Sequence, residues 1–444
     1  MLAIALPMIV STSCDGIMTF TDRLFLSRLG PEQMNAAMGG GVAMQMMMFF
    51  FIGLTGYTTA LVAQYYGAGQ KKLGPVAAFQ AILIALFAYP VILICKPLGL
   101  AFFGFMQVPE GQLGYQITYF NIVLYGVVIG ILRNVLSCYF SGLGRTKIVM
   151  FAALTSMVVN VVLDYIMIFG KFGFPAMGIE GAAIATVTGG FCGLLILAFA
   201  YFGKSNWNEF QVAGSFRFEP EVMRKLLHFG YPAGLELFLN FLAFTTVIFI
   251  FHSQGPVSAT ASTIMFNWDL ISFIPLLGIE IAVTSLVGRY MGAGDPGTAH
   301  LSAMSGIKTG IFYSFVVLLL FLFIPEFLVR VFHPSNASGL FEQVVPIAKS
   351  MIRIAALYVL AEAVMVAIVG ALRGAGDTHF TMIISVSAHW TFVPVIYLML
   401  NVWNYSPVMG WLGLVIMFLL FCSVLIWRYW SGKWQEIKVV ASRE

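Results

Sequence analysis

The chain has 444 residues, of which 60% are hydrophobic and only 9% are charged, and its formal net charge is +4. Soluble globular proteins carry about 25% charged residues. This composition therefore excludes a soluble protein and indicates a polytopic membrane protein whose surroundings are the lipid bilayer, with no nucleic-acid partner. The five cysteines all lie in apolar runs, contain no CxxC pair and are odd in number, which favours small buried residues over a disulfide framework or a metal site.

Twelve apolar runs are long enough to cross a membrane, because a spanning helix needs about 20 mostly apolar residues for a hydrocarbon core of about 30 Å. They lie at residues 2–28, 35–67, 74–104, 113–142, 147–169, 179–203, 222–252, 258–289, 299–324, 344–372, 378–402 and 409–430. Only the connection at Lys204–Arg217 is longer and polar, and it divides the chain into two sets of six. We therefore predict an all-α protein with 12 transmembrane helices: an N-lobe at 1–203, a cytoplasmic connection at 204–221, a C-lobe at 222–430 and a cytoplasmic tail at 431–444.

The orientation follows from the positive residues. Lys and Arg are about twice as frequent on the side of the predicted spans that carries both ends of the chain, and positive residues concentrate on the cytoplasmic side. We therefore expect both termini in the cytoplasm and the protein in the plasma (inner) membrane. Arg133, inside the fourth run, is interpreted as a side chain that extends to the inner membrane face.

The two halves of the chain repeat each other. Tyr65–Gly69, which ends the second run, contains a Gly-Ala-Gly triplet that returns in Arg289–Gly294 at the end of the eighth. Ser141–Thr146 after the fourth run is likewise similar to Arg373–Thr378 after the tenth. Each half has an even number of spans, so the halves share one topology and are related by an axis along the membrane normal. Transporters with such repeats commonly bind their substrates at the repeat interface, near the bilayer midplane.

The first half carries a group of polar residues inside the membrane. Asn160 and Asp164 are four residues apart and share one helix face. Asp22 in the first run lies at a similar depth, so adjacent runs would form a pocket of two carboxylates and an amide. A carboxylate at a helix centre costs roughly 2.5–3.5 kcal/mol on insertion scales, which makes it a candidate functional residue. The pocket would suit a proton carrier or a Na⁺ site; alternatively each acid is satisfied by packing, with Asp22 paired to Arg23.

The second half has acids of its own near mid-membrane, at positions that do not match those of the first half. Glu236 and Asn240 are four residues apart in the seventh run, as are Tyr358 and Glu362 in the tenth, and Glu280 lies in the eighth. No Lys or Arg is expected near these glutamates inside the membrane. They would therefore require protons, a cation such as Na⁺ at Glu236 and Glu362, or both.

Several motifs, taken in order, are similar to those of the multidrug and toxic compound extrusion (MATE) family. They are Thr21–Asp22 with Leu29–Gly30, Ala63–Gln70, Gly142–Lys147, Asn160–Thr186, Val287–Asp295 and Leu372–Thr378. The resemblance extends over essentially the whole chain. It implies two pseudo-symmetric six-helix bundles around a central cleft, and alternating access that exchanges exported amphipathic organic cations for H⁺ or Na⁺.

The resemblance also implies roles for individual residues. Asp22, Asn160 and Asp164 match the N-lobe cation site of the family. Tyr358 and Glu362 resemble a Tyr-x-x-x-Asp element of the C-lobe, here with Glu in place of Asp. Asn240 stands where some members carry a glutamate, and Glu236 lies one turn earlier. Together with Glu280, these residues are the candidates for ion coupling or substrate binding in the C-lobe.

Two other functions were compared with export. A lipid-linked or polysaccharide flippase of the same superfamily is the alternative, but it would predict a more basic cavity and often fourteen spans. An intramembrane aspartyl protease would use the GxGD sequences at Gly292–Asp295 and Gly374–Asp377, yet both end apolar runs at the cytoplasmic rim and read as turns. No HExxH, P-loop or nucleophile elbow occurs. We therefore expect a monomeric transporter that is not an enzyme, with no cofactor beyond the coupling ion.

Overall fold

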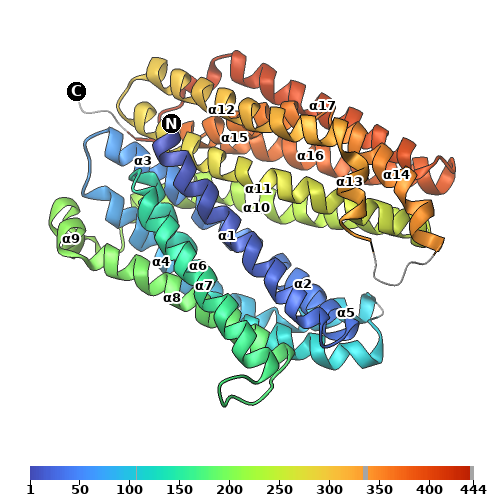
Figure 1. Ribbon diagram of the computed structural model, residues 1–444. Coiled ribbons are helices and arrows are strands. Elements are labelled where there is room, and N and C mark those ends of the chain that lie inside the picture. The colour runs from blue at the N-terminus through green and yellow to red at the C-terminus, as the bar shows by residue number, and fades with distance from the viewer. Residues whose placement is uncertain (107, 334–338, 441–444) are drawn as a thin grey trace.

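The computed structural model describes residues 1–106, 108–333 and 339–440, and the first half of the chain forms one helical bundle (Figure 1). Its helices are α1 (Leu2–Ser27), α2 (Pro31–Gly56), α3 (Thr58–Gly67), α4 (Leu73–Ile94), α5 (Lys96–Phe105), α6 (Glu110–Gly142), α7 (Thr146–Phe169) and α8 (Ile179–Phe202). The connection to the second half contains α9 (Lys204–Phe210) and the short 3-10 turn η1 (Val212–Ser215).

The second half forms the other bundle. Its helices are α10 (Pro220–His252), α11 (Pro256–Gly292), α12 (Pro296–Phe323), α13 (Pro325–Arg330), α14 (Gly339–Ala355), α15 (Val359–Ala375), α16 (Thr378–Tyr397), the π-helical η2 (Leu398–Val402), α17 (Pro407–Trp430) and η3 (Lys433–Glu436). The described residues contain no β-strand. Helices suit a membrane interior, because each backbone N–H and C=O of a helix finds its partner within the segment itself.

The number of membrane spans agrees with the prediction. Eleven helical segments are long and apolar enough to cross a bilayer, and α14 and α15, bent by 49° at their junction, make the twelfth when counted as one span. The ends of these segments follow local sequence signals. Pro31, Pro220, Pro256, Pro296 and Pro407 each occupy the first position of their helix, where the missing N–H has no intrahelical partner to lose.

The two bundles lie side by side, and Figure 1 shows both termini at the same end of the molecule. We call this the termini end and the opposite one the far end. The lobes are in close contact at the termini end: the Gln64 amide donates a hydrogen bond of 2.8 Å to the Gly374 carbonyl, and the Ser285 hydroxyl donates one of 2.6 Å to the Ser141 carbonyl. Each of these bonds joins a residue of the first half to one of the second.

The repeated Gly-Ala-Gly triplets face each other in this contact. A Cβ atom at Gly67 would lie 1.8 Å from the carbonyl oxygen of Arg289, and one at Gly292 would lie 2.1 Å from that of Gln64. Both distances are far below van der Waals contact, so α3 and α11 can approach this closely only because these two positions lack a side chain. The two copies of the internal repeat therefore supply both surfaces of this close contact between the lobes, which we call the seal.

The chain after α17 also crosses between the lobes at the termini end. Trp434 is fully buried among C-lobe residues, stacks on Tyr429 with ring centroids 5.3 Å apart, and donates its indole N–H to the Tyr429 carbonyl. Val439 and Val440 are buried in a cluster made mostly of N-lobe residues. This segment therefore packs against both lobes at the termini end.

The glycine contact predicts the effect of adding one methyl group. Gly67→Ala should destabilise the closed termini end by roughly 1–3 kcal/mol, the usual cost of overpacking. A cysteine placed at buried Ser285, in a background without other cysteines, should then react with a thiol reagent about five- to hundred-fold faster. Gly74→Ala is the matched control, since its Cβ would meet the nearest atom at 3.7 Å. Equal labelling in both variants would contradict this account of the seal.

Candidate functional site

The predicted N-lobe residues meet in the interior of the first bundle. Asp22 on α1 and Asn160 and Asp164 on α7 are all buried, with exposed fractions of 6%, 0% and 0%. The Asp164 carboxylate lies beside both Asp22 and Asn160. Thr186 on α8 donates a hydrogen bond of 3.0 Å to Oδ2 of Asp22. Three helices therefore contribute to one polar group, and the structure brings together all three residues that the sequence predicted.

Local sequence explains why α7 and α8 pack so closely at this group. Ser156, Asn160 and Asp164 recur every four residues along α7 and are all buried. A Cβ atom at Gly189 of α8 would lie 2.8 Å from the Ser156 carbonyl oxygen and 2.9 Å from Cβ of Asn160. The glycine therefore lets α8 approach the polar stripe of α7, and one turn earlier on α8 Thr186 reaches Asp22.

The polar atoms of this N-lobe group lack fixed partners. Oδ1 of Asp22, both carboxylate oxygens of Asp164 and both amide atoms of Asn160 are buried without a hydrogen bond to any described residue. Arg23 interacts with Asp22 electrostatically but forms no ion pair with it within 4.0 Å, so packing against Arg23 does not account for the carboxylate. Buried carboxylates without a paired charge are strongly unfavourable. The group therefore has no compensating charge among the described residues.

The donor set fits either of the two ions that the sequence suggested. Two adjacent carboxylates can share a single proton, as they do in aspartic proteases. Hard cations prefer carboxylate, amide and hydroxyl oxygens, and Asp22, Asp164, Asn160 and Thr186 offer those, so Na⁺ is also compatible with the residues present.

The first C-lobe group contradicts one expectation from the sequence. Glu236 on α10 and Glu280 on α11 were predicted to lack a nearby Lys or Arg, but Arg373 of α15 pairs with both. Its Nη2 lies 3.1 Å from Oε2 of Glu236, and its Nη1 lies 2.5 Å from Oε1 of Glu280. Counting along the tenth run placed Arg373 at the membrane rim. The side chain instead turns back between α10 and α11, where two carboxylates attract it.

The second C-lobe group lies where α14 meets α15. The Tyr358 hydroxyl donates a short hydrogen bond to the carboxylate of Asp269 on α11. Glu362, one turn into α15, is buried and interacts electrostatically with Asp269. Asp269 was not among the predicted site residues, although its position within an apolar run was a signal for it. No Lys or Arg forms an ion pair with this group in the described part of the chain.

The C-lobe candidates therefore divide into separate groups. Glu236 and Glu280 share Arg373, Tyr358 and Glu362 lie with Asp269, and Asn240 donates a 2.8 Å hydrogen bond to Ser385 of α16. The sequence could show that these residues were inside the membrane, but not which of them would meet.

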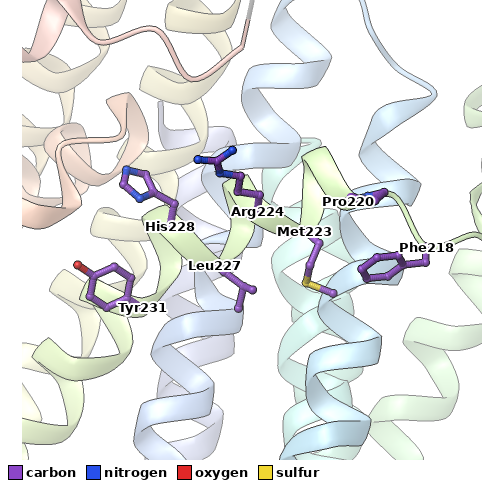
Figure 2. A pocket seen from close by; sticks show the side chains of 7 residues that line it. All are labelled: Phe218, Pro220, Met223, Arg224, Leu227, His228 and Tyr231. Carbon is purple, nitrogen blue, oxygen red and sulfur yellow. The ribbon is translucent and has the colours of Figure 1, made fainter.

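The surface pockets lie away from these carboxylates. One of about 410 Å³ lies at the start of α10, and Figure 2 shows Arg224 and His228 extending from the same side of that helix. Its lining comprises Phe218, Pro220, Met223, Arg224, Leu227, His228 and Tyr231. Another, of about 560 Å³, opens at the far end beside the α7–α8 turn. Neither is lined by a predicted site residue, so the carboxylate groups remain the candidate site.

Comparison with known proteins gives consistent matches along the chain. The family model described as MatE matches residues 7–166 and 232–398. The chain is 28% identical over 451 residues to the probable multidrug resistance protein NorM of Thermotoga maritima, covering 100% of this chain and 94% of that protein. It is 29% identical over 431 residues to the multidrug resistance protein PmpM of Pseudomonas aeruginosa, covering 94% and 87%.

Solved structures show the same fold. A MOP superfamily transporter from Pyrococcus furiosus superimposes with a TM-score of 0.88 at 20% identity, covering 97% of this chain and 96% of that one. An outward-facing multidrug resistance MATE family transporter superimposes with a TM-score of 0.86 at 19% identity, covering 98% and 96%. These likenesses confirm the predicted arrangement of two helical lobes.

The Arg373 pairing predicts an asymmetric effect on stability. Arg373→Gln should lower the free energy of unfolding by about 3–5 kcal/mol, because it leaves two buried carboxylates without their cation. Arg373→Gln combined with Glu280→Gln should restore part of this loss. The exposed Arg330–Glu326 pair is the control, since Arg330→Gln should change stability by only about 0–1 kcal/mol. Melting of the purified protein in detergent measures all three. A double variant no more stable than Arg373→Gln alone would be evidence against the pairing.

Proposed function

This chain belongs to the MatE family, and from that membership we propose that it exports amphipathic organic cations from the cell in exchange for H⁺ or Na⁺. The observation that carries the proposal is the buried pair of Asp22 and Asp164, whose oxygens lack a fixed positive partner. A bound proton or cation would satisfy such a pair. The names of the relatives, which are multidrug resistance proteins matched over most of their length, support drugs as the exported molecules.

The contacts of α1 suggest how ion binding is transmitted to the lobes. Asp22 near the far end of α1 lies within the N-lobe group, where Thr186 holds it. Nearer the termini end, Thr12 donates a hydrogen bond of 3.2 Å to the Ile274 carbonyl of α11, and a Cβ atom at Gly278 would lie 2.5 Å from the backbone nitrogen of Ile9. One helix thus contacts the ion site and the opposite lobe. An ion that draws Asp22 towards α7 therefore also shifts the helix that contacts α11.

The arrangement in the membrane follows from the same features. Both termini lie at one end of the molecule, the end with the excess of Lys and Arg, which supports a cytoplasmic location for both in the plasma (inner) membrane. The seal between the lobes also lies at that end. In this state, the proposed exchange of substrate and coupling ion with the outside therefore takes place at the far end. The protein acts as a monomer, and its substrates are small cationic molecules.

The N-lobe pair is tested by neutralising one carboxylate. Asp164→Asn should reduce dye efflux from proteoliposomes driven by an imposed ion gradient by about tenfold or more, because a single acid no longer holds the coupling ion. Imposing ΔpH and ΔNa⁺ separately identifies that ion.

Asp295→Asn is the control for the Asp164 variant. Asp295 is an exposed helix cap outside the membrane. Hydrogen bonds from the side chain of Thr298 and then from its backbone amide lower the pKa of the Asp295 carboxyl. Asn caps helices about as well as Asp, so transport should be unchanged. Full gradient-driven efflux by folded Asp164→Asn would rule out the N-lobe assignment.

The C-lobe groups should differ in their importance for transport. Glu236→Gln leaves Arg373 and Glu280 as a balanced pair, so efflux should fall by less than about threefold. Glu362→Gln removes a carboxylate from a group without a paired cation, and efflux should fall by about tenfold or more. Both variants are compared in the same proteoliposome assay. An effect of Glu236→Gln as large as that of Glu362→Gln would show that Arg373 does not neutralise its partners.

A further inference from the structure

An intramembrane ion pair between Asp15 and Arg133 has no role in the proposed ion coupling. Nη2 of Arg133, on α6, lies 3.0 Å from Oδ1 of Asp15, on α1. The sequence suggested that Arg133 extends to the inner membrane face, which is wrong. The side chain crosses to α1, because the Asp15 carboxylate attracts its guanidinium at close range.

The Asp15 carboxylate is accessible from within the protein and does not face lipid. The lipid-facing side of α1 is marked by its exposed apolar residues, which are Leu6, Val10, Ile17, Phe20 and Leu24. Asp15 lies instead on the stripe that includes buried Met18 and Asp22, three and seven residues further on. The next residue, Gly16, packs against Ile274 of α11. Asp15 therefore faces α6 of the first lobe, while the adjacent Gly16 contacts α11 of the second.

Depth and exposure together indicate a water-accessible position. Asp15 lies about 20 Å along α1 from its first residue, Leu2, which is near the middle of the spanning helix. Its side chain is nevertheless 52% exposed, whereas that of Arg133 is 25% exposed. A charged group at this depth faces the protein interior or a water-filled space, not lipid. A ligand between the lobes can thus reach Asp15 more easily than Arg133.

Arg133 is held in place by its stem, while its head group makes only one bond to the acid. A Cβ atom at Gly193 of α8 would lie 3.4 Å from Cδ of Arg133, so the aliphatic part packs on α8. A single hydrogen bond joins the guanidinium to Asp15, although a guanidinium can bind a carboxylate through two. This geometry leaves the pair open to exchange with another cation.

We propose that Asp15 binds the positively charged group of the substrate, and that Arg133 is a tethered counter-ion which holds the carboxylate until that group displaces it. The inference rests on the proposed export of organic cations and adds the residue that receives them. The ligand class is an amphipathic molecule with an amine or delocalised iminium charge. Asp15 and Asp22 are seven residues apart on one helix, so substrate and coupling ion occupy different carboxylates of α1.

If Arg133 is a tethered counter-ion, its removal has the opposite effect from the removal of one member of a structural ion pair. A resident cation competes with the substrate for Asp15, so removing it should strengthen substrate binding. A structural pair behaves differently, because loss of either member leaves the other uncompensated and weakens the protein. The direction of the change on removing Arg133 therefore distinguishes the two roles.

Binding and efflux of two matched dyes test the proposal. A rhodamine ethyl ester is a cation, and its free acid is a zwitterion of nearly the same shape. For the ester, Asp15→Asn should raise Kd by about tenfold or more and Arg133→Gln should lower it by about tenfold. Arg133→Lys should bind as the wild type does, and the Asp15→Asn, Arg133→Gln double variant should resemble Asp15→Asn. Arg330→Gln, which alters an exposed pair at the far end, is the control and should change nothing.

The outcomes separate this inference from the function on which it rests. Failure of the wild-type protein to bind or move either dye would count against the export of organic cations itself. Wild-type transport together with an unchanged Asp15→Asn, or with weaker ester binding in Arg133→Gln, would overturn only the role of the ion pair. The role of the ion pair would also be overturned if Arg133→Gln bound the free acid more weakly and the ester unchanged. Arg133 would then be a receptor for the substrate carboxylate. If Arg133→Gln does not fold, the charge-balanced double variant and Arg133→Lys provide the comparison.

Discussion

A carboxylate inside a membrane is energetically unfavourable without a compensating charge, and the arrangement of the polar groups in this protein depends on that constraint. Glu236 and Glu280 satisfy it with a fixed cation, Arg373, whereas Asp15 forms a single hydrogen-bonded ion pair with Arg133. The pair of Asp22 and Asp164 has no such partner among the described residues, and its oxygens are buried without hydrogen bonds to satisfy them. The requirement is therefore unmet by a fixed cation at this N-lobe pair and also at the C-lobe group of Asp269 and Glu362, which has no paired Lys or Arg among the described residues.

Helix α1 connects this requirement to the relative position of the lobes. It carries Asp15 and Asp22 on one stripe, and it contacts α11 of the other lobe through Thr12 and Gly16. The lobes are meanwhile held together at the termini end by the glycine contact, which tolerates no added methyl group. A charge that enters beside α1 therefore acts on a helix shared by both lobes, while a rigid seal fixes one end of the contact between them.

Much of the fold could be predicted because it depends on properties that are local in the chain. The spans follow from the length of the apolar runs, and the two lobes follow from the polar connection and the repeated turns. The meeting of Asp22 with Asn160 and Asp164 was also predictable, because helical spacing and depth already placed them at one level. The break at Tyr358 was not, because the nearest preceding Pro in the run, Pro346, lies twelve residues earlier and no Gly stands between them. The break occurs where the Tyr358 hydroxyl reaches Asp269.

By itself, the sequence determined how many helices cross the membrane, which residues carry charge inside it, and that the two halves repeat. These are consequences of hydropathy and spacing along one chain. Only the tertiary structure decided how those charges are paired. Arg133 and Arg373 have long, flexible side chains, so their depth in the sequence does not show which acid they reach. That choice depends on which helices pack together, and it separates the carboxylates that have a paired cation from those that have none among the described residues.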